Sequence, residues 1–272
     1  MSKIKLVAMD IDETLLDDNQ VISLANQNAI AAAMEQGVKI VLASGRTHSG
    51  MAEYLNKLKI AGNDQYIITN GGSLVETLND EVIYHKALSN QTYRQIDAFV
   101  KENDLHYNAV DVKGQTYTSN TDSIDRYTII QAFENDKGLL IRQPDQLPAD
   151  FEILKAIINE PKERLDQITP AVEQEFGEDY YVIRTGAGFL EIMPKNIDKG
   201  SALTYLAEYL QLDLSETMAI GDGENDIPML RKAGVSVVMN NATDSIKNLA
   251  DFITADNNQS GVAKAFEKYI LN

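Results

Sequence analysis

Short, continuously apolar runs alternate with longer amphipathic stretches at both ends of this 272-residue chain, and this rhythm constrains the fold more than any other feature. Residues 4–9, 38–43 and 66–69 are predicted strands. A helix that begins at the N-cap residue Ser23 and stops at Gly37 separates the first two. Strands without polar alternation are covered on both faces, so the pattern predicts a parallel sheet with helices on either side.

The same rhythm returns near the C-terminus, with predicted strands at residues 217–220 and 235–239. Between the two ends the pattern changes to an α+β mixture, which is typical of a separate domain inserted into the first. We therefore predict an α/β fold with a parallel-sheet core and a large insertion, and the expected bounds are residues 1–83 and 189–272 for the core and 84–188 for the insertion.

Charge and composition exclude several classes of partner. The chain has 41 acidic and 24 basic residues, a formal net charge of −17, so it repels nucleic acids and anionic membrane surfaces. Any phosphate site must therefore be made locally positive by a metal ion, a lysine and backbone amides. Cysteine is absent, and the apolar runs are too short for a signal peptide or a membrane span. We expect a soluble cytoplasmic protein.

Two polar clusters follow predicted strands. The first, residues 10–15, contains Asp10 and Asp12, and the second contains Ser44 and Gly45 just before a predicted helix. Ligands of a parallel sheet gather at the carboxyl ends of its strands. The two carboxylates can point towards one centre there, and Ser44 can bind an anion beside exposed backbone N–H groups. Taken singly, the acids also fit a solvated turn, and the serine fits an ordinary helix N-cap.

Two further clusters lie in the C-terminal part. Lys199 stands at the start of a predicted helix, where its charge opposes the helix dipole, and we expect an exposed ammonium that reaches an anion. Residues 221–226 place Asp222 and Asp226 in a glycine-containing loop after another strand. Because like charges ~4 Å apart cost on the order of 4 kcal/mol per pair, these acids predict a hard cation such as Mg²⁺.

Together the four clusters resemble the signature of the haloacid dehalogenase superfamily, whose phosphatases carry D-x-D-x-T, a Ser or Thr, a Lys and G-D-x-x-x-D in that order. Residues 69–72 and the large insertion look like the Cof-type sugar-phosphatase branch. The resemblance implies a Rossmann-like core with a cap domain, and a Mg²⁺-dependent phosphatase of small phosphorylated metabolites, sugar phosphates above all, that forms an aspartyl-phosphate. The matching residues are Asp10, Asp12, Thr14, Ser44, Lys199, Asp222 and Asp226.

The resemblance also implies a role for each matching residue. Asp10 is the implied nucleophile, and Asp12 the group that protonates the leaving oxygen and later activates water. The Asp10 carboxylate, the Asp12 backbone carbonyl and the Asp222 carboxylate are the implied metal ligands. The other implied contacts are Ser44, Gly45, Lys199 and Asn225 for the phosphate, with Asp226 and Asn70 as supporting residues.

A few residues stand outside this signature. Glu13 occupies a position where many family members have glycine. The difference affects the expected backbone shape of the loop and adds an acid near the metal. His48, His85 and His106 share no metal-ligand spacing, so we expect core or surface roles for them. Tyr117 of the insertion is expected to pack rather than bind substrate.

Three other functions are compatible with parts of the pattern. A phosphomutase of the same fold would return the phosphoryl group to a sugar, and product analysis distinguishes it from a phosphatase. A receiver-like signalling module would keep the phosphoryl group on Asp10, but such modules are about half this length and have no inserted domain. A glycosyltransferase could use Asp10 and Asp12 as a metal motif, but it leaves Lys199 and residues 221–226 unexplained.

Overall fold

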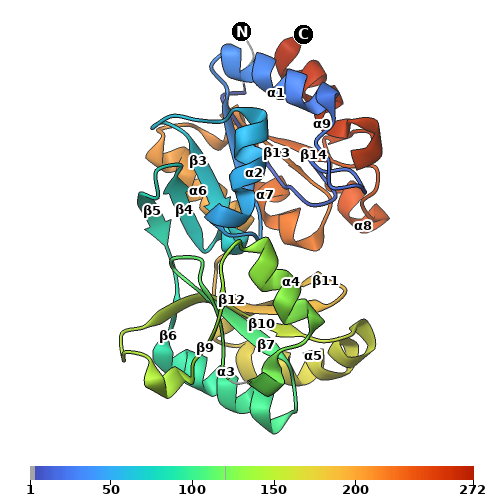
Figure 1. The fold of residues 1–272 in the computed structure, drawn as a ribbon. Coiled ribbons are helices and arrows are strands. Elements are labelled where there is room, and N and C mark those ends of the chain that lie inside the picture. The colour runs from blue at the N-terminus through green and yellow to red at the C-terminus, as the bar shows by residue number, and fades with distance from the viewer. Residues whose placement is uncertain (1–3, 120) are drawn as a thin grey trace. The chain divides into compact units, whose positions relative to one another are not determined.

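The computed structural model describes residues 4–119 and 121–272, which form two compact units (Figure 1). The first contains the residues up to Gly45 together with Met51–Tyr84 and Asp198–Asn272, and the second contains Arg46–Gly50 and His85–Ile197. The predicted fold class, a parallel core sheet plus a second sheet built from an insertion, is confirmed.

The first unit is built on an eight-stranded sheet with the order β15-β14-β13-β1-β2-β3-β4-β5. The strands from β15 to β3 are parallel, whereas β4 runs antiparallel to β3. Their bounds are β1 (Leu6–Met9), β2 (Lys39–Ala43), β3 (Tyr66–Thr69), β4 (Leu74–Thr77), β5 (Val82–His85), β13 (Thr217–Gly221), β14 (Val235–Val238) and β15 (Phe252–Ile253).

Helices pack on both faces of this sheet, which explains why its parallel strands are mainly apolar. In β1, Val7 and Met9 contribute to one buried cluster, and Leu6 and Ala8 contribute to the other. Because side chains alternate along a strand, the two clusters lie on opposite faces. The first face is covered by α1 (Leu24–Glu35), α2 (His48–Leu58) and α9 (Gly261–Phe266), and the second by α6 (Lys199–Tyr209), α7 (Ile227–Lys232) and α8 (Asp244–Lys247).

Local signals set the ends of these elements. The Ser23 side chain accepts a hydrogen bond from the Asn26 amide, so the predicted N-cap of α1 is confirmed. The helix ends one residue before Gln36, and Gly37 follows in the left-handed region at φ +84°. The chain then enters β2 and returns to the carboxyl edge of the sheet beside β1.

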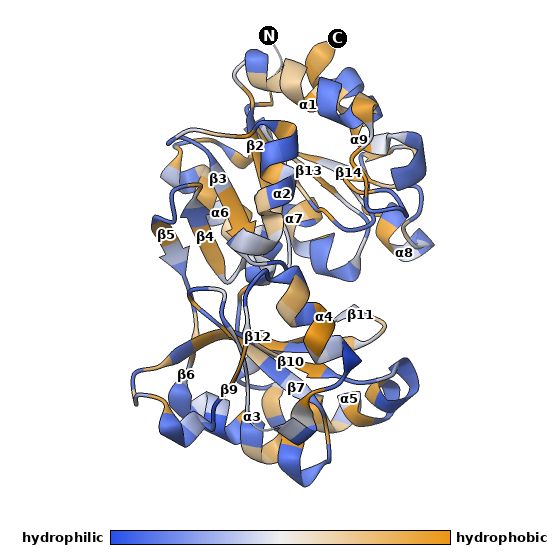
Figure 2. Ribbon diagram, in the orientation of Figure 1, coloured by the Kyte–Doolittle hydropathy of each residue, from blue (hydrophilic) through white to orange (hydrophobic). Residues whose placement is uncertain are grey.

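The second unit holds a seven-stranded, mainly antiparallel sheet with the order β11-β12-β10-β7-β8-β9, and β6 pairs with β10. Helices α3 (Asn90–Glu102) and α5 (Lys162–Phe176) bury one face of it. Helix α4 (Arg126–Glu134) contains apolar residues (Figure 2), of which Ile129, Ile130 and Phe133 are exposed. The strands are β6 (Leu88–Ser89), β7 (Tyr107–Asp111), β8 (Thr116–Thr118), β9 (Leu139–Ile141), β10 (Glu152–Asn159), β11 (Tyr180–Gly186) and β12 (Phe189–Pro194).

Two features differ from the expectation. The second unit extends to Ile197 rather than residue 188, because β12 hydrogen-bonds to β10 and β11 of the second sheet. The β4 and β5 strands extend the first sheet beyond its parallel part and were not predicted. Over the residues that the structure describes, no helix combines the length and the apolar character that crossing a bilayer requires.

Candidate active site

Asp10, Lys199 and Asp226 meet at the carboxyl edge of the first sheet. Asp10 directly follows β1, and its amide donates to the carbonyl of Ile220 in β13, so the β1 and β13 loops leave the sheet side by side. The Lys199 ammonium lies 2.5 Å from Asp10 Oδ1 and 2.7 Å from Asp226 Oδ1. The ammonium of the third predicted cluster therefore binds one carboxylate from the first cluster and one from the fourth.

These charges are buried. The side chains of Lys199 and Asp226 are fully buried, and that of Asp10 is 9% exposed, so the expectation of an exposed lysine is wrong. Burial alone lowers the pKa of Lys199, but the Asp10 and Asp226 carboxylates outweigh it and raise the pKa above its ordinary value. Burial raises the pKa of Asp10 well above its usual range, against the opposing effect of Lys199. The lysine is thus charged at neutral pH.

The start of α6 positions Lys199. The Asp198 side chain caps this helix by accepting from the Ser201 amide at 2.7 Å, which fixes where the first turn begins. Gly200 allows α6 and α7 to approach closely, since a Cβ there would lie 2.4 Å from the carbonyl group of Pro228. This approach brings the start of α6 to the loop that carries Asp226.

Asp226 is committed on both oxygens. Its Oδ1 binds Lys199, and its Oδ2 accepts hydrogen bonds of 3.0 Å from the backbone amides of Asp222 and Gly223. A carboxylate held in this way orders the 221–226 loop and has little capacity left for a further ligand. The supporting role of Asp226 stays a prediction.

Asp222 lies at the outer side of this cluster. Thr14, which is fully buried, donates a hydrogen bond of 2.5 Å to Asp222 Oδ1. Burial, and then the Asp226 carboxylate, raise the pKa of Asp222 to about 7, while the Thr14 hydrogen bond works in the opposite direction. The sequence indicates Thr14 only as part of the motif, because this contact spans 208 positions and leaves no local signal.

The acids fit a divalent hard cation. Asp10, Asp222 and Asp226 each offer an oxygen, and the three atoms lie within 4.8 Å of one another. Since Asp226 is committed to Lys199 and two amides, Asp10 and Asp222 have the oxygens best able to bind a metal. An all-oxygen donor set of this kind suits Mg²⁺. Asp12 is partly buried in the adjoining turn.

The second predicted cluster lies on the neighbouring strand. Ser44, which is 1% exposed, follows β2, and its carbonyl accepts from the Gly71 amide at 3.0 Å. The turn at Asn70–Gly72 also adjoins α6, because a Cβ on Gly72 would lie 2.3 Å from the Asp198 carbonyl oxygen. Among the described residues none hydrogen-bonds to the buried Oδ1 of Asn70, so it can accept a hydrogen bond from a ligand or water.

The remaining predicted residues are placed less specifically. Gly45 follows Ser44, and Asn225 is partly buried between Glu224 and Asp226 in the same loop as Asp222. His106 pairs with Glu160 at 2.9 Å within the second unit, whereas the acidic cluster belongs to the first.

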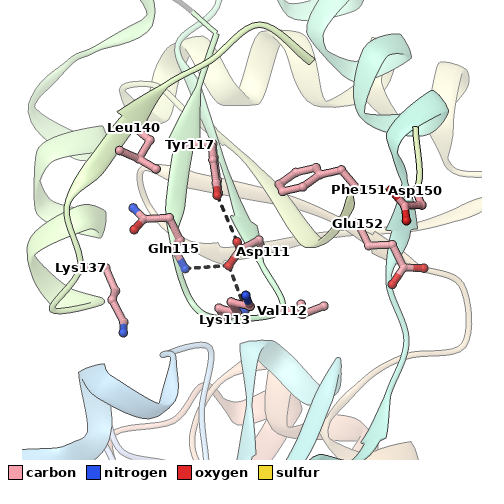
Figure 3. A pocket seen from close by; sticks show the side chains of 10 residues that line it. All are labelled: Asp111, Val112, Lys113, Gln115, Tyr117, Lys137, Leu140, Asp150, Phe151 and Glu152. Atoms are coloured by element: carbon pink, nitrogen blue, oxygen red, sulfur yellow. Dashed lines mark hydrogen bonds between the residues drawn. The ribbon is translucent and has the colours of Figure 1, made fainter. Parts of the chain in front are cut away.

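The second unit has an open pocket of its own, of about 540 Å³ (Figure 3). Asp111 lies at its centre and accepts from the amides of Lys113 and Gln115 and from the Tyr117 hydroxyl. Burial, followed by the Asp111 charge, raises the pKa of Tyr117 to about 12. Tyr117 also packs edge-on against Phe151, so it both packs and lines a pocket.

A parallel α/β core with a buried Asp–Lys–Asp cluster at its strand ends, interrupted by an insertion that forms a second sheet, defines an α/β enzyme with an inserted domain. The family model described as haloacid dehalogenase-like hydrolase matches residues 7–266, so the chain belongs to that family. The resemblance seen in the motifs is therefore confirmed, and the chain is a phosphatase of the haloacid dehalogenase type.

Known relatives cover nearly the whole chain. A candidate phosphatase of Streptococcus pyogenes is 35% identical over 99% of both chains. The Bacillus subtilis protein YcsE, named 5-amino-6-(5-phospho-D-ribitylamino)uracil phosphatase, is 29% identical over 98% of this chain and 96% of its own. A crystal structure of a haloacid dehalogenase-like hydrolase from Bacteroides thetaiotaomicron is 30% identical, with a TM-score of 0.84 over 97% of this chain and 99% of that one.

Proposed function

We propose that this phosphatase hydrolyses monoesters of small polyhydroxylated metabolites, sugar phosphates among them, through an aspartyl-phosphate on Asp10 with the help of Mg²⁺. The observation that carries the proposal is the contact of Lys199 with one oxygen of Asp10. Within the described residues, the other oxygen receives no hydrogen bond. A buried carboxylate held on one side presents its second oxygen as a nucleophile.

The phosphoryl group of the substrate is negatively charged, so a strongly acidic protein needs specific groups to bind it. Lys199, the Ser44 hydroxyl, the Gly45 amide and Asn225 are the groups that we assign to the phosphoryl oxygens, with Asn70 beside them. Mg²⁺ held by Asp10, Asp222 and the Asp12 carbonyl would supply charge neutralisation at the phosphoryl group and keep the carboxylates ionised. These assignments rest on the converging contacts of Lys199 and on the family motifs.

The reaction then has two half-steps. The free oxygen of Asp10 attacks phosphorus, the bond to the leaving oxygen breaks, and the protonated Asp12 carboxyl gives its proton to that oxygen. In the second half, the Asp12 carboxylate removes a proton from water as the water oxygen attacks phosphorus. The bond between phosphorus and Asp10 breaks, orthophosphate leaves, and both aspartates return to their first states.

The substrate class is suggested by a named relative. YcsE acts, by its name, on a phosphate ester of a ribityl chain, which is an open-chain polyol. We assign the choice of leaving group to the second unit, as the cap of the catalytic core. Its open pocket, lined by charged and aromatic residues, supports this assignment because it offers binding surface within that unit.

The test is phosphate release from 4-nitrophenyl phosphate with and without Mg²⁺, comparing the parent with Asp10→Asn. The proposal expects Mg²⁺-dependent release by the parent and none by the variant, whose circular dichroism stays unchanged. Full activity of Asp10→Asn would refute it. A panel of sugar and polyol phosphates then distinguishes a phosphatase from a phosphomutase. Release of free orthophosphate supports hydrolysis, and formation of an isomeric sugar phosphate supports a mutase.

A further inference from the structure

Glu13 lies in the loop of Asp10 and Asp12, and nothing in the proposed chemistry uses it. Its backbone has φ +59°, and its side chain is exposed. This left-handed conformation suits glycine, whereas a residue with a Cβ is strained in it. The chain therefore keeps a carboxylate at a position where the backbone favours glycine.

The surrounding contacts prevent the loop from relaxing. The carbonyl of Glu13 accepts a hydrogen bond of 2.8 Å from Asn241 Nδ2. On the next residue, the buried hydroxyl of Thr14 is bound to Asp222. With both sides anchored, the strain at Glu13 is retained, and it points to a function for the side chain rather than the backbone.

The carboxylate of Glu13 adds negative charge to the exposed part of the loop that carries Asp10 and Asp12. Among the residues that the structure describes, no lysine, arginine or histidine pairs with it. Its charge acts on Asp222, whose pKa it helps to raise after the larger effects of burial and Asp226, so it lies within electrostatic reach of the cluster. The Lys199 ammonium of the cluster is already shared between Asp10 and Asp226.

We propose that Glu13 is a specificity-determining residue that disfavours phosphate esters whose leaving group carries negative charge. This inference rests on the proposed function, in which Asp12 protonates the leaving oxygen and so lies against the leaving group. Glu13 directly follows Asp12. Consecutive residues lie closer together than the Debye length, which is about 8 Å at physiological salt. An uncharged polyol is indifferent to this carboxylate, whereas a carboxylated or second phosphorylated group is repelled.

A matched pair of aryl esters isolates the charge. Phenyl phosphate and 4-carboxyphenyl phosphate differ by one remote carboxylate, and their kcat/KM values are compared in the parent and in Glu13→Gln. In the variant, the ratio of kcat/KM for the carboxylated ester to kcat/KM for the neutral ester is expected to rise on the order of fivefold at low ionic strength, mainly through a lower KM for the carboxylated ester. The parent's discrimination shrinks as salt is raised, because the carboxylates are screened from each other.

Two further variants separate charge from other effects. Glu13→Gly also removes the charge and relieves the backbone strain, so it should match the selectivity of Glu13→Gln without a lower melting temperature. Glu35→Gln removes an exposed acid on α1 and should leave the ratio of the two esters unchanged. This control has the same change in net charge.

Three results would overturn the inference: an unchanged ratio in Glu13→Gln, an equal change for both esters, or the same shift in Glu35→Gln. Calorimetric titration with Mg²⁺ gives a reading without substrate. If Glu13→Gln weakens Mg²⁺ binding and slows both esters alike, Glu13 serves the metal instead. Failure of the proposed function looks different, since the parent would then release phosphate from neither ester.

Discussion

Lys199 and Asp226 form an ion pair of 2.7 Å although the side chains of both are fully buried. The same ammonium also holds Asp10, so one positive charge is shared by two carboxylates. With Asp222 ionised the cluster is doubly negative, which opposes the binding of a phosphate dianion. Under the proposed function, a divalent cation would cancel this charge, and the buried Lys199 would then bind the phosphoryl group directly.

Replacing Lys199 by methionine should damage both stability and turnover. The substitution leaves Asp10 and Asp226 buried without their cation. Breaking a buried pair on one side costs about 3–5 kcal/mol, so we expect a loss of that size in urea unfolding of the metal-free protein, together with loss of hydrolysis. Lys39→Met is the control, because its pair with the largely exposed Asp64 is worth less than about 1 kcal/mol. Equal effects of the two variants would contradict a buried role for Lys199.

Mg²⁺ affinity should rise with pH through neutrality. Burial and Asp226 raise the pKa of Asp222 to about 7, and the metal binds the ionised carboxylate. Below that pH the affinity is expected to fall by up to about tenfold per pH unit, with protons released on binding. Calorimetry between pH 5.5 and 8.5, in buffers of different ionisation enthalpy, measures both quantities. A flat affinity across this range would mean that Asp222 is not a titrating ligand.

The stability of the metal-free protein should change with pH in the opposite direction. The folded pKa of Asp222 exceeds its unfolded value of about 3.9, so the folded state binds the extra proton. The stabilisation is present at low pH and is lost as pH rises from about 4 to 7. Asp222→Asn lacks this pH-dependent contribution. The difference in melting temperature between the parent and the variant should therefore be smaller at pH 5 than at pH 8. Parallel curves would contradict the raised pKa.

Thr14 should tune this titration. Its hydroxyl favours the ionised form of Asp222, so Thr14→Val, which keeps the shape and removes the donor, should move the midpoint of the Mg²⁺ titration to higher pH. Thr14→Ser keeps the donor and should leave the midpoint close to that of the parent. If valine and serine shift it equally, packing of the methyl group rather than the hydrogen bond sets the pKa.

Gly200→Ala tests the close approach of α6 to α7. The added Cβ would lie 2.4 Å from the Pro228 carbonyl group, so the helices must separate, at a cost of about 1–3 kcal/mol. The move would also lengthen the contact between Lys199 and Asp226 and slow hydrolysis. Gly138→Ala is the control, since no atom of the described residues lies within 4 Å of the position that a Cβ would take there. A fully stable and active Gly200→Ala would show that the approach is dispensable.

Much of the core could be predicted because its signals are local. The strand at Tyr66–Thr69 has the expected bounds, and Ser23 caps the helix that its position predicted. The burial of Lys199 could not be predicted, because its partners lie 189 and 27 positions away and only packing shows that they enclose it. The helix-start position made an exposed lysine the simpler expectation.

Other misses have different causes. The β4–β5 hairpin has a local signal in the sequence, a turn near Asn79 and Asp80 between β-branched stretches. The later end of the insertion depends on β12 pairing with β10, and apolar strands of either sheet look alike in sequence. Thr14 lay inside a motif, but only the structure shows that it binds Asp222.

The most direct test of the account is chemical trapping of the covalent intermediate. Turnover of a phosphate monoester in the presence of Mg²⁺ is quenched with acid, the protein is reduced with borohydride, and its peptides are examined by mass spectrometry. An acyl phosphate on Asp10 is reduced to homoserine, so the account predicts homoserine at position 10 in the parent and none in Asp10→Asn. Homoserine at Asp12 or Asp222, or an unmodified Asp10 during steady turnover, would contradict it.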